Sequence, residues 1–365
     1  MGSRGLGCLG WAGCCLLLAA SWARAEVRWI QVSEFNHFER ESSGSSAWVS
    51  PEWQSPIPFR ELVLSCNLQA DSAKASSLQV EAQVKTAGRW GRWWHLGRWG
   101  GPMAGAGTDE APKRTSIRGQ RDETGAVETD TLVLRSDAAA VRVRVRFDDP
   151  AAGPVLLKRM DLSLWSPKAV ADSEPRFTAD PSRVLEVPMK SQADYPEGVT
   201  QWCSPTSLAM LMAHWGRQSG KPEWDLDVRT VAAGVHDPGW PGTGNWSFNA
   251  AYAGSRPGLQ AAAVRLAGLD DLAALLEAGI PVATSVSYAV LKGAAKPEKG
   301  DGHLVVICGL SPSTVTVNDP GVRLSRVRRE FPLPAFRAAW SASHQTAYVV
   351  WPEGRTLPVS PSGTW

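Results

Sequence analysis

The chain has 365 residues, of which 43% are hydrophobic, and its formal net charge is +2. This length is enough for two domains with sizeable cores, and the near-neutral charge argues against nucleic acid as a partner. No stretch after residue 25 is long and apolar enough to span a bilayer.

The N-terminus is typical of an export signal. An apolar run at 16–20 precedes Ala23-Arg24-Ala25, which has the pattern of a cleavage site. We expect residues 1–25 to be a signal peptide cleaved after Ala25, so that the mature protein is secreted or periplasmic. A lipid anchor on Cys14 or Cys15 is the weaker alternative, because most of the apolar run follows these cysteines.

Three cysteines remain beyond the predicted signal peptide, namely Cys66, Cys203 and Cys308. An odd number does not form a disulfide framework, and it leaves room for a reactive thiol in an exported protein. A bridge between Cys66 and Cys308 would have to cross from one predicted domain to the other, and we do not expect it.

Residues 26–166 are predicted to form an antiparallel β-sandwich. Apolar and polar side chains alternate at 78–85 and at 141–147, which is the period of a strand with one buried face. Clusters of turn-forming residues separate the strand candidates, and no helical pattern intervenes. The further candidates are residues 27–32, 59–66, 129–135 and 155–165.

Residues 90–99 contain four tryptophans interleaved with Arg92 and Arg98. Exposed tryptophan faces stack on sugars, and arginines add cation–π contacts, so the segment is a candidate surface for a cell-wall glycan. In the alternative interpretation, most of these tryptophans fill the core of the sandwich and the arginine side chains point outward.

Residues 167–183 mix proline, alanine, serine and charged residues without any period. We predict that they form a linker to a second domain at 184–365.

In this second domain Cys203 precedes an amphipathic helix pattern. Four apolar residues fall at i, i+3, i+4 and i+7, namely Leu208, Leu211, Met212 and Trp215. Ser204 is the predicted N-cap and Gly216 the predicted end of the helix. The free N–H groups at a helix N-terminus favour a thiolate, which is how a nucleophilic cysteine is activated when a base lies nearby. The alternative is an unreactive core cysteine.

A predicted hairpin supplies a candidate base. Residues 302–310 form a β-branched strand with His303 at its start, and residues 314–318 return to end at Asp319. Such a hairpin places His303 and Asp319 at the same end, as the orienting pair that a cysteine nucleophile needs. Taken singly, His303 is explained equally well as a core histidine, and Asp319 is explained better as part of an Asp-Pro turn. Together with Cys203 they favour catalysis.

These motifs resemble the papain-like cysteine peptidases, and most closely the double-glycine-leader (bacteriocin-processing) peptidases and their free-standing exported relatives. The matching stretches within 184–352 are 187–192, 203–216, 272–281, 302–306 and 317–320.

The resemblance implies an α+β protein in which a papain-like domain follows the β-sandwich. It implies that Cys203 is the nucleophile, His303 the general base, Asp319 the orienting carboxylate and Gln192 the oxyanion amide. Gln201 competes with Gln192 for the last role.

The expected function is therefore an exported thiol hydrolase that cleaves peptide bonds in a peptide or protein substrate. One alternative is a cell-wall amidase or transamidase of the same fold. Another is a surface- or carbohydrate-binding protein whose peptidase-like domain is inactive, an idea prompted by Ser204, where the family usually has glycine. We expect a monomer, and no histidine or cysteine spacing predicts a metal or cofactor site.

Overall fold

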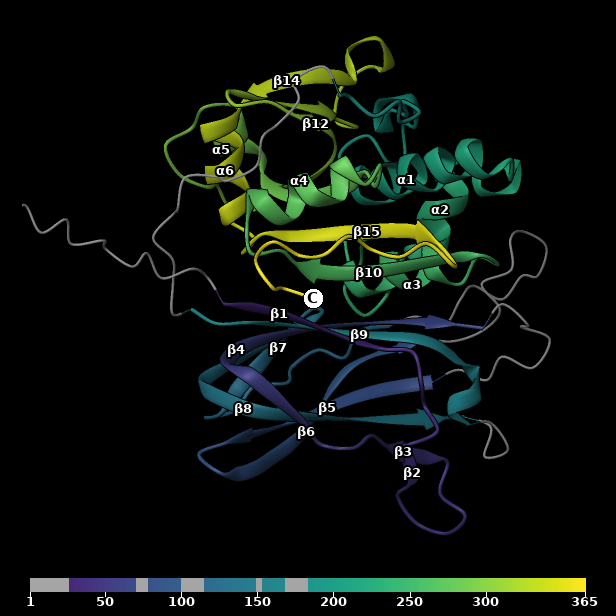
Figure 1. Ribbon diagram of the computed structural model, residues 1–365, viewed down its shortest axis with the longest axis vertical. Coiled ribbons are helices and arrows are strands. Elements are labelled where there is room, and N and C mark those ends of the chain that lie inside the picture. The colour runs from purple at the N-terminus through teal and green to yellow at the C-terminus, as the bar shows by residue number, and fades with distance from the viewer. Residues whose placement is uncertain (1–25, 70–77, 100–114, 149–152, 168–182) are drawn as a thin grey trace, which may run out of the picture.

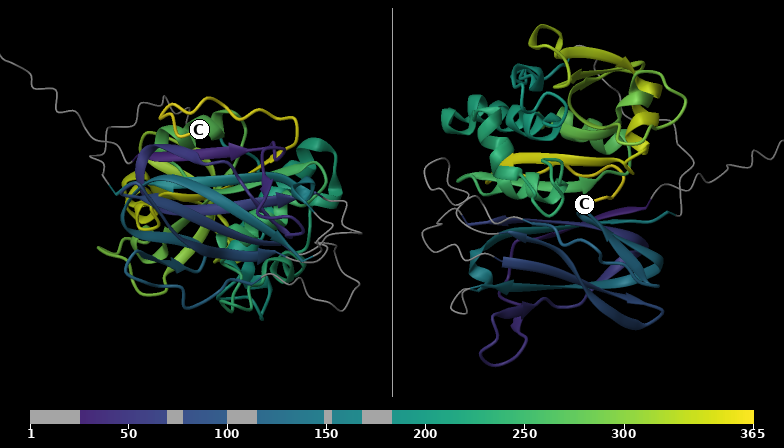
Figure 2. Two further views of the ribbon diagram at one scale, coloured as in Figure 1. Left: turned by 90° about the horizontal axis from the view of Figure 1, so that it is seen from below. Right: turned by 180° about the vertical axis from the view of Figure 1, so that it is seen from behind.

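The computed structural model describes residues 26–69, 78–99, 115–148, 153–167 and 183–365. The predicted signal peptide and residues 168–182 of the predicted linker lie outside these ranges. The described residues form an α+β protein with one antiparallel sheet in each half of the chain, and the two halves lie against each other (Figure 1, Figure 2).

The N-terminal half contains strands only, apart from a short 3-10 turn at Pro154–Leu156, within the part that the structure describes. Its sheet has the order β1-β9-β4-β8-β3-β2; β5 and β7 also pair with β8, and β6 pairs with β5. In Figure 1, β1 and β9 lie next to the C-terminal half, and β5 and β6 lie away from it. The strands are β1 (Val27–Val32), β2 (Glu39–Arg40), β3 (Ala47–Val49), β4 (Trp53–Leu68), β5 (Leu78–Thr86), β6 (Arg89–Trp99), β7 (Gly125–Glu128), β8 (Thr131–Phe147) and β9 (Leu157–Trp165).

The predicted strands at 129–135 and 141–147 are one continuous strand, β8. The residues between them stay extended because they are paired on both sides: Ala138 lies opposite Phe59 of β4 and Thr86 of β5. The prediction of two separate strands was wrong, since the exposed Arg135 and Ser136 interrupt the apolar alternation without interrupting the ladder.

The C-terminal half packs helices around a six-stranded sheet of order β10-β15-β11-β12-β13-β14. Its strands are β10 (Leu259–Arg265), β11 (Val282–Ser287), β12 (Gly302–Leu310), β13 (Thr314–Asn318), β14 (Arg328–Pro332) and β15 (Thr346–Pro352). Its helices are α1 (Cys203–Ser219), α2 (Val228–Val235), α3 (Trp246–Gly254), α4 (Leu269–Glu277), α5 (Tyr288–Leu291) and α6 (Leu333–Ser341).

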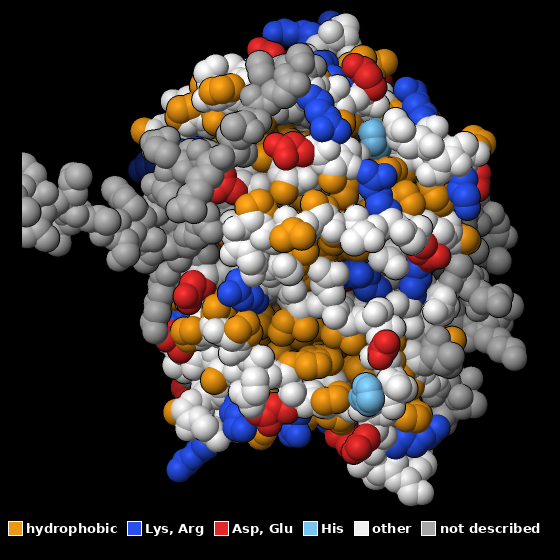
Figure 3. All heavy atoms as spheres, viewed as in Figure 1, with side chains coloured by type: hydrophobic (Ala, Val, Ile, Leu, Met, Phe, Trp, Pro, Cys, Tyr) orange, Lys and Arg blue, Asp and Glu red, His pale blue; other side chains and the backbone are white. Residues whose placement is uncertain are grey.

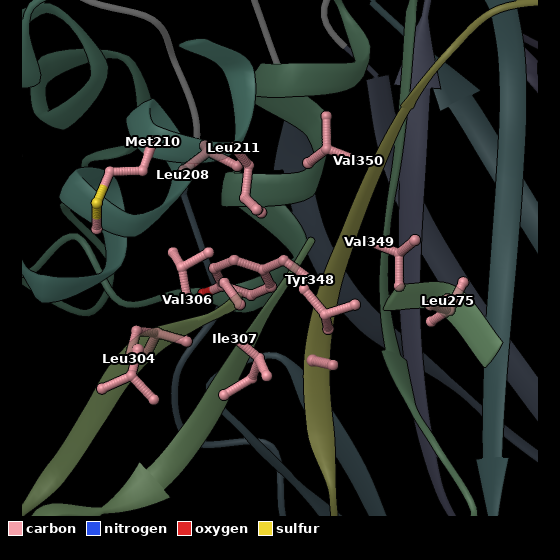
Figure 4. Packing of buried hydrophobic residues seen from close by; sticks show 14 of the residues in the cluster. Leu208, Met210, Leu211, Leu275, Leu304, Val306, Ile307, Tyr348, Val349 and Val350 are labelled. Carbon is pink, nitrogen blue, oxygen red and sulfur yellow. The ribbon is translucent and has the colours of Figure 1, made fainter. Parts of the chain in front are cut away.

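Helix α1 is buried along most of its length, so its apolar residues form the centre of this core. Leu208 and Leu211 of α1 belong to one hydrophobic core with Val306, Tyr348 and Val350 of the sheet, and Figure 4 shows this core from close by. Because the helix is enclosed by protein, its first residue is held in a fixed place relative to the sheet.

Both predicted ends of α1 need correction. The helix starts at Cys203 itself, with Trp202 as N-cap, and the Ser204 hydroxyl lies 2.8 Å from the buried Tyr348 hydroxyl instead of capping. Gly216 lies inside the helix, which continues to a left-handed Gly220 with φ +64°. Glycine is needed at 216 because a Cβ there would lie 2.8 Å from the Lys221 carbonyl oxygen.

The outer edge of β10 is covered by side chains of the N-terminal half. The backbone N–H groups of Ala261, Ala263 and Arg265 donate to Asn67 Oδ1, Ser65 Oγ and Ser163 Oγ, at 2.9, 3.1 and 2.8 Å. An edge strand normally leaves such groups unpaired, so here the first sheet completes the hydrogen bonding of the second.

Candidate active site

Cys203 is partly buried at the first position of α1. Burial raises the pKa of its thiol. The hydrogen bond and charge of His303, with the backbone N–H groups of Leu304 and Ser204, lower the pKa by more than burial raises it, so the net pKa lies below that of an ordinary thiol. The sulfur is therefore held in an environment that favours the nucleophilic thiolate.

His303 lies at the start of β12 and is 7% exposed. Its Nε2 lies 2.8 Å from Asp319 Oδ1, which leaves Nδ1 for the contact with Cys203. Burial lowers the pKa of the imidazole, but the hydrogen bonds and negative charges of Asp319 and Cys203 raise it to about 9. The ring is thus favoured as imidazolium beside a thiolate.

Asp319 follows β13 and is fully buried. Burial raises its pKa, but the hydrogen bond and charge of His303 and the N–H of Gly321 lower it to about 2. The structure therefore brings Cys203, His303 and Asp319 into one hydrogen-bonded chain, in the arrangement that the predicted hairpin required.

Two partners of Asp319 were missed by the sequence analysis. The Tyr288 hydroxyl donates to Asp319 Oδ2 at 2.9 Å, and Arg329 Nη1 donates to the same oxygen at 2.8 Å. The Tyr288 ring also lies 4.3 Å from the His303 ring. Burial, with the charge of Asp319, raises the pKa of Tyr288 to about 12, so its hydroxyl stays a donor. An alternating Arg/apolar pattern around Arg329 was visible, but nothing in it points to Asp319.

The two candidate oxyanion glutamines lie in different surroundings. Gln192 is buried; its backbone N–H donates to the Pro320 carbonyl at 3.0 Å and its Nε2 donates to the Val199 carbonyl at 2.7 Å. Gln201 lines the cavity beside Cys203.

This cavity, of about 600 Å³, lies between the two halves of the chain, and we call it the interdomain cavity. Its wall on the side of the C-terminal half includes Cys203, Gln201 and the 43%-exposed Trp240. Its other wall comes from Glu61 and the 128–131 turn of the N-terminal half. No sequence pattern indicated that the N-terminal half reaches the cysteine.

The tryptophan-rich segment is β6, away from Cys203. Trp94 and Trp99 are buried in the N-terminal core, so the core interpretation, which expected this of most of the four tryptophans, holds for two of them. Trp90 and Trp93 are partly exposed, and the Arg142 guanidinium lies 4.6 and 5.3 Å from their rings. On the face drawn in Figure 3, basic and acidic side chains are interspersed.

Other predictions concern cysteines and histidines. Cys66 and Cys308 are both buried and free, which confirms that they are not bridged. His214 is 3% exposed, because it lies in the stretch of α1 that the surrounding protein buries. Among the residues that the structure describes, no helix is long and apolar enough to cross a membrane.

Comparison with known proteins identifies two family models in the chain. Residues 184–348 match the Peptidase C39-like family, and residues 28–157 match the Peptidase C39 N-terminal domain. A search of curated proteins found no match.

Solved structures with detectable similarity include one described as a C39-like peptidase from Bacillus anthracis, at 18% identity and a TM-score of 0.37, covering 47% of this chain and 98% of that chain. Another is the peptidase domain of Streptococcus ComA, a bifunctional ABC transporter, at 16% identity and a TM-score of 0.31, covering 47% and 99%. A third is a double-glycine-motif protease from a transporter with its leader peptide, at 15% identity and 0.30, covering 48% and 99%.

Proposed function

We propose that this protein, whose residues 184–348 belong to the C39-like peptidase family, is a cysteine peptidase that uses Cys203, His303 and Asp319 to hydrolyse peptide bonds. The observation that carries the proposal is the continuous chain of hydrogen bonds from the cysteine through the imidazole to a buried carboxylate. We infer a papain-like arrangement, since the helix that bears the nucleophile packs on the sheet that bears the histidine. In the N-terminal half, the separation of β1 and β9 from β5 and β6 into two layers likewise supports a sandwich (Figure 1).

The reaction follows from these positions. The Cys203 thiolate attacks the scissile carbonyl carbon and forms a tetrahedral oxyanion. As the C–N bond breaks, the His303 imidazolium gives its proton to the leaving amine, and a thioester remains on Cys203. His303, now neutral, takes a proton from a water that attacks the thioester, and the acid product leaves with the thiolate and imidazolium restored. Asp319 holds the ring in place throughout.

We propose Gln192 as the side-chain donor to the oxyanion, together with the Cys203 backbone N–H, which has no partner within the helix because Cys203 is the first residue of α1. Its Nε2 has a second hydrogen beyond the one donated to Val199. Gln201, which lines the cavity, is the alternative. Removing an oxyanion donor typically lowers kcat by about 10²–10³, so separate Gln192→Ala and Gln201→Ala variants will identify which residue acts.

The primary test combines labelling and cleavage. Iodoacetamide should alkylate Cys203 in the folded protein well below pH 8, while burial raises the pKa of Cys66 and Cys308 and protects both until the protein is unfolded. Wild-type protein should cleave members of a mixed peptide library, and Cys203→Ala should cleave none. If Cys203 labels no faster than the two buried cysteines, or if Cys203→Ala retains the cleavage, the peptidase mechanism is wrong.

The substrate and the site of action also remain our proposals. The proposed partner is a peptide or protein; a cell-wall amidase or transamidase would share the thiol chemistry and differ in the acceptor. Glycan binding by β6 is the less favoured proposal, because Arg142 and Arg144 lie over the ring of Trp93. We propose export with cleavage after Ala25, which intact-mass measurement of the mature protein will test.

A further inference from the structure

The interdomain cavity contains a group of charged side chains that the proposed mechanism does not use. Glu61 and Asp130 come from the N-terminal half, and Arg265 and His344 come from the C-terminal half. All four line the same cavity as Cys203. A substrate that extends from the cysteine into the cavity would therefore meet this group.

Two of the charges in this group already neutralise each other. Arg265 Nη2 lies 2.5 Å from Glu61 Oε2, and His344 Nδ1 lies 3.2 Å from the same oxygen. Glu61 is therefore occupied by partners from the opposite half, and it is not available to a ligand.

Arg265 keeps unused hydrogen-bond donors. Its side chain is 3% exposed, and neither Nε nor Nη1 has a hydrogen-bond partner among the described residues. Buried donors without an acceptor are rare, because each costs the free energy of its lost hydration. A guanidinium in this state on a cavity wall points to an acceptor oxygen supplied by a ligand.

Asp130 offers the complementary group. Its two oxygens accept from the Trp246 N–H at 2.5 Å and from the Thr131 hydroxyl at 3.2 Å, which leaves further acceptor capacity on both. No ion pair joins it to any described residue, although the charge of Arg265 acts on it, and burial raises its pKa to about 6. At neutral pH it is thus a buried carboxylate beside a buried guanidinium.

The backbone around the cavity is also held under strain. Thr129 (φ +61°) and His344 (φ +52°) are two of the four non-glycine residues with positive φ in the described part of the chain, and both line the cavity. Such conformations cost free energy and cluster at functional sites. Two turns of the cavity wall are therefore held in uncommon backbone conformations.

We propose that the interdomain cavity is a specificity pocket for a side-chain carboxamide, that of glutamine or asparagine, with Arg265 donating to the amide oxygen and Asp130 accepting from the amide nitrogen. A substrate carboxylate would meet the like charge of Asp130, and an ammonium has no lone pair to accept from Arg265 Nε and Nη1, whereas a carboxamide supplies both an acceptor and a donor. The N-terminal half thereby becomes part of the substrate site. This inference rests on the proposed peptidase function.

The test uses the full-length chain and peptides in which one residue is glutamine, glutamate, lysine or leucine at each of several positions around a cleaved bond. At one position, kcat/KM for glutamine should exceed that for the other three by about tenfold or more, since a pocket built to hydrogen-bond an amide leaves its polar groups unpaired otherwise. Equal rates at every position, or a preference for lysine or glutamate, would overturn the proposal.

Substitutions of Asp130 and Arg265 test the two walls of the cavity one at a time. Asp130→Asn removes the like charge, so the ratio of the rate for the glutamate peptide to the rate for the glutamine peptide should rise. Arg265→Lys keeps the charge opposite Glu61 but loses the planar group of N–H donors, so the rate for the glutamine peptide should fall relative to the rate for the leucine peptide. Glu123→Gln, an exposed acid before β7 and outside the cavity, is the matched control. Thermal unfolding checks that each variant folds.

The leucine peptide distinguishes failure of this inference from failure of the function. If Cys203-dependent cleavage of it persists without any glutamine preference, only the specificity pocket is wrong. If no peptide is cleaved by the wild-type protein, the peptidase proposal itself fails.

Discussion

At the residue scale, activity depends on where the protons of Cys203 and His303 lie. The pKa of Cys203 is lowered and that of His303 is raised to about 9. The thiolate–imidazolium pair is therefore the main form when the pH lies above the first pKa and below the second. We expect kcat/KM to rise with pH through the cysteine pKa, below the free value of about 8.5, and to fall through about pH 9 as the imidazolium loses its proton.

The same argument predicts how this profile changes in Asp319→Asn. The carboxylate raises the His303 pKa, so its removal should move the alkaline limb to lower pH as well as reduce the maximum rate. Asp227→Asn, which removes an exposed carboxylate that bonds Tyr195, is the control and should leave both limbs in place. An unchanged alkaline limb in Asp319→Asn would mean that Asp319 does not control the imidazole.

Tyr288 is predicted to be a positioning residue that acts through Asp319. Tyr288→Phe keeps the ring beside His303 and removes the hydroxyl that donates to Asp319 at 2.9 Å. A hydrogen bond to a charged group contributes about 1.5–3 kcal/mol, so we expect kcat to fall at least about tenfold with little change in KM.

Tyr195→Phe is a matched control, because its hydroxyl also donates to a carboxylate, Asp227, at 3.0 Å, on the surface. Steady-state kinetics and pH profiles of both variants test whether the Tyr288 hydroxyl acts through Asp319. Equal kinetics for the two variants would contradict a role for Tyr288 in orienting the pair.

At the element scale, the connection after β13 is packed against the candidate site. A Cβ on Gly321 would lie 2.9 Å from His303 Cε1 and 3.2 Å from Asp319 Oδ1. Gly321→Ala should therefore push the two side chains apart and lower kcat by about tenfold or more, in line with the sensitivity of catalysis to small displacements. Stability should change by less than about 1 kcal/mol, because the three atoms nearest to the added Cβ belong to side chains, which can rotate slightly.

Gly91→Ala serves as the control for Gly321→Ala, because its added Cβ meets only an ordinary contact at 3.7 Å. Activity and the urea midpoint are measured for both proteins. Full activity in Gly321→Ala would show that the loop moves away without disturbing His303.

The elements of the site were predictable from the sequence to the extent that they are local. The hairpin that joins His303 to Asp319 follows from β-branched strands and a Ser-Pro-Ser turn, and the helix after Cys203 follows from its apolar period. Tyr288 was not predictable, because α5 reaches Asp319 only through tertiary packing, and Arg329 was not, because the sequence does not give the register of β14 on β13. Ser204 was misjudged for the same reason: its partner, Tyr348, is far away in sequence.

At the scale of the whole molecule, the two halves share their interiors. Phe248 and Ala251 of α3 belong to the N-terminal core, and Trp29 and Val63 belong to the C-terminal core. Strand periodicity predicts that a face is buried but does not say by what, so the sequence suggested two separate modules. The N-terminal half is instead a wall of the cavity at Cys203.

This sharing predicts that the chain unfolds as one unit. Asn67 is fully buried in β4; its side chain donates to the Ala261 carbonyl at 2.8 Å and accepts from the Ala261 N–H at 2.9 Å, replacing the strand that β10 lacks at its edge. Asn67→Ala leaves two buried backbone groups unpaired, at about 1–3 kcal/mol each. Its free energy of unfolding should fall by roughly 3 kcal/mol, whereas Asn36→Ala, at an exposed position, should change it almost not at all.

Urea titrations followed by tryptophan fluorescence and by far-UV circular dichroism should give coincident transitions in both variants, because losing the hydrogen bonds between the two halves weakens both cores. Two separated transitions in the wild type would contradict a shared interior, and with it the idea that the N-terminal half keeps a fixed position beside Cys203.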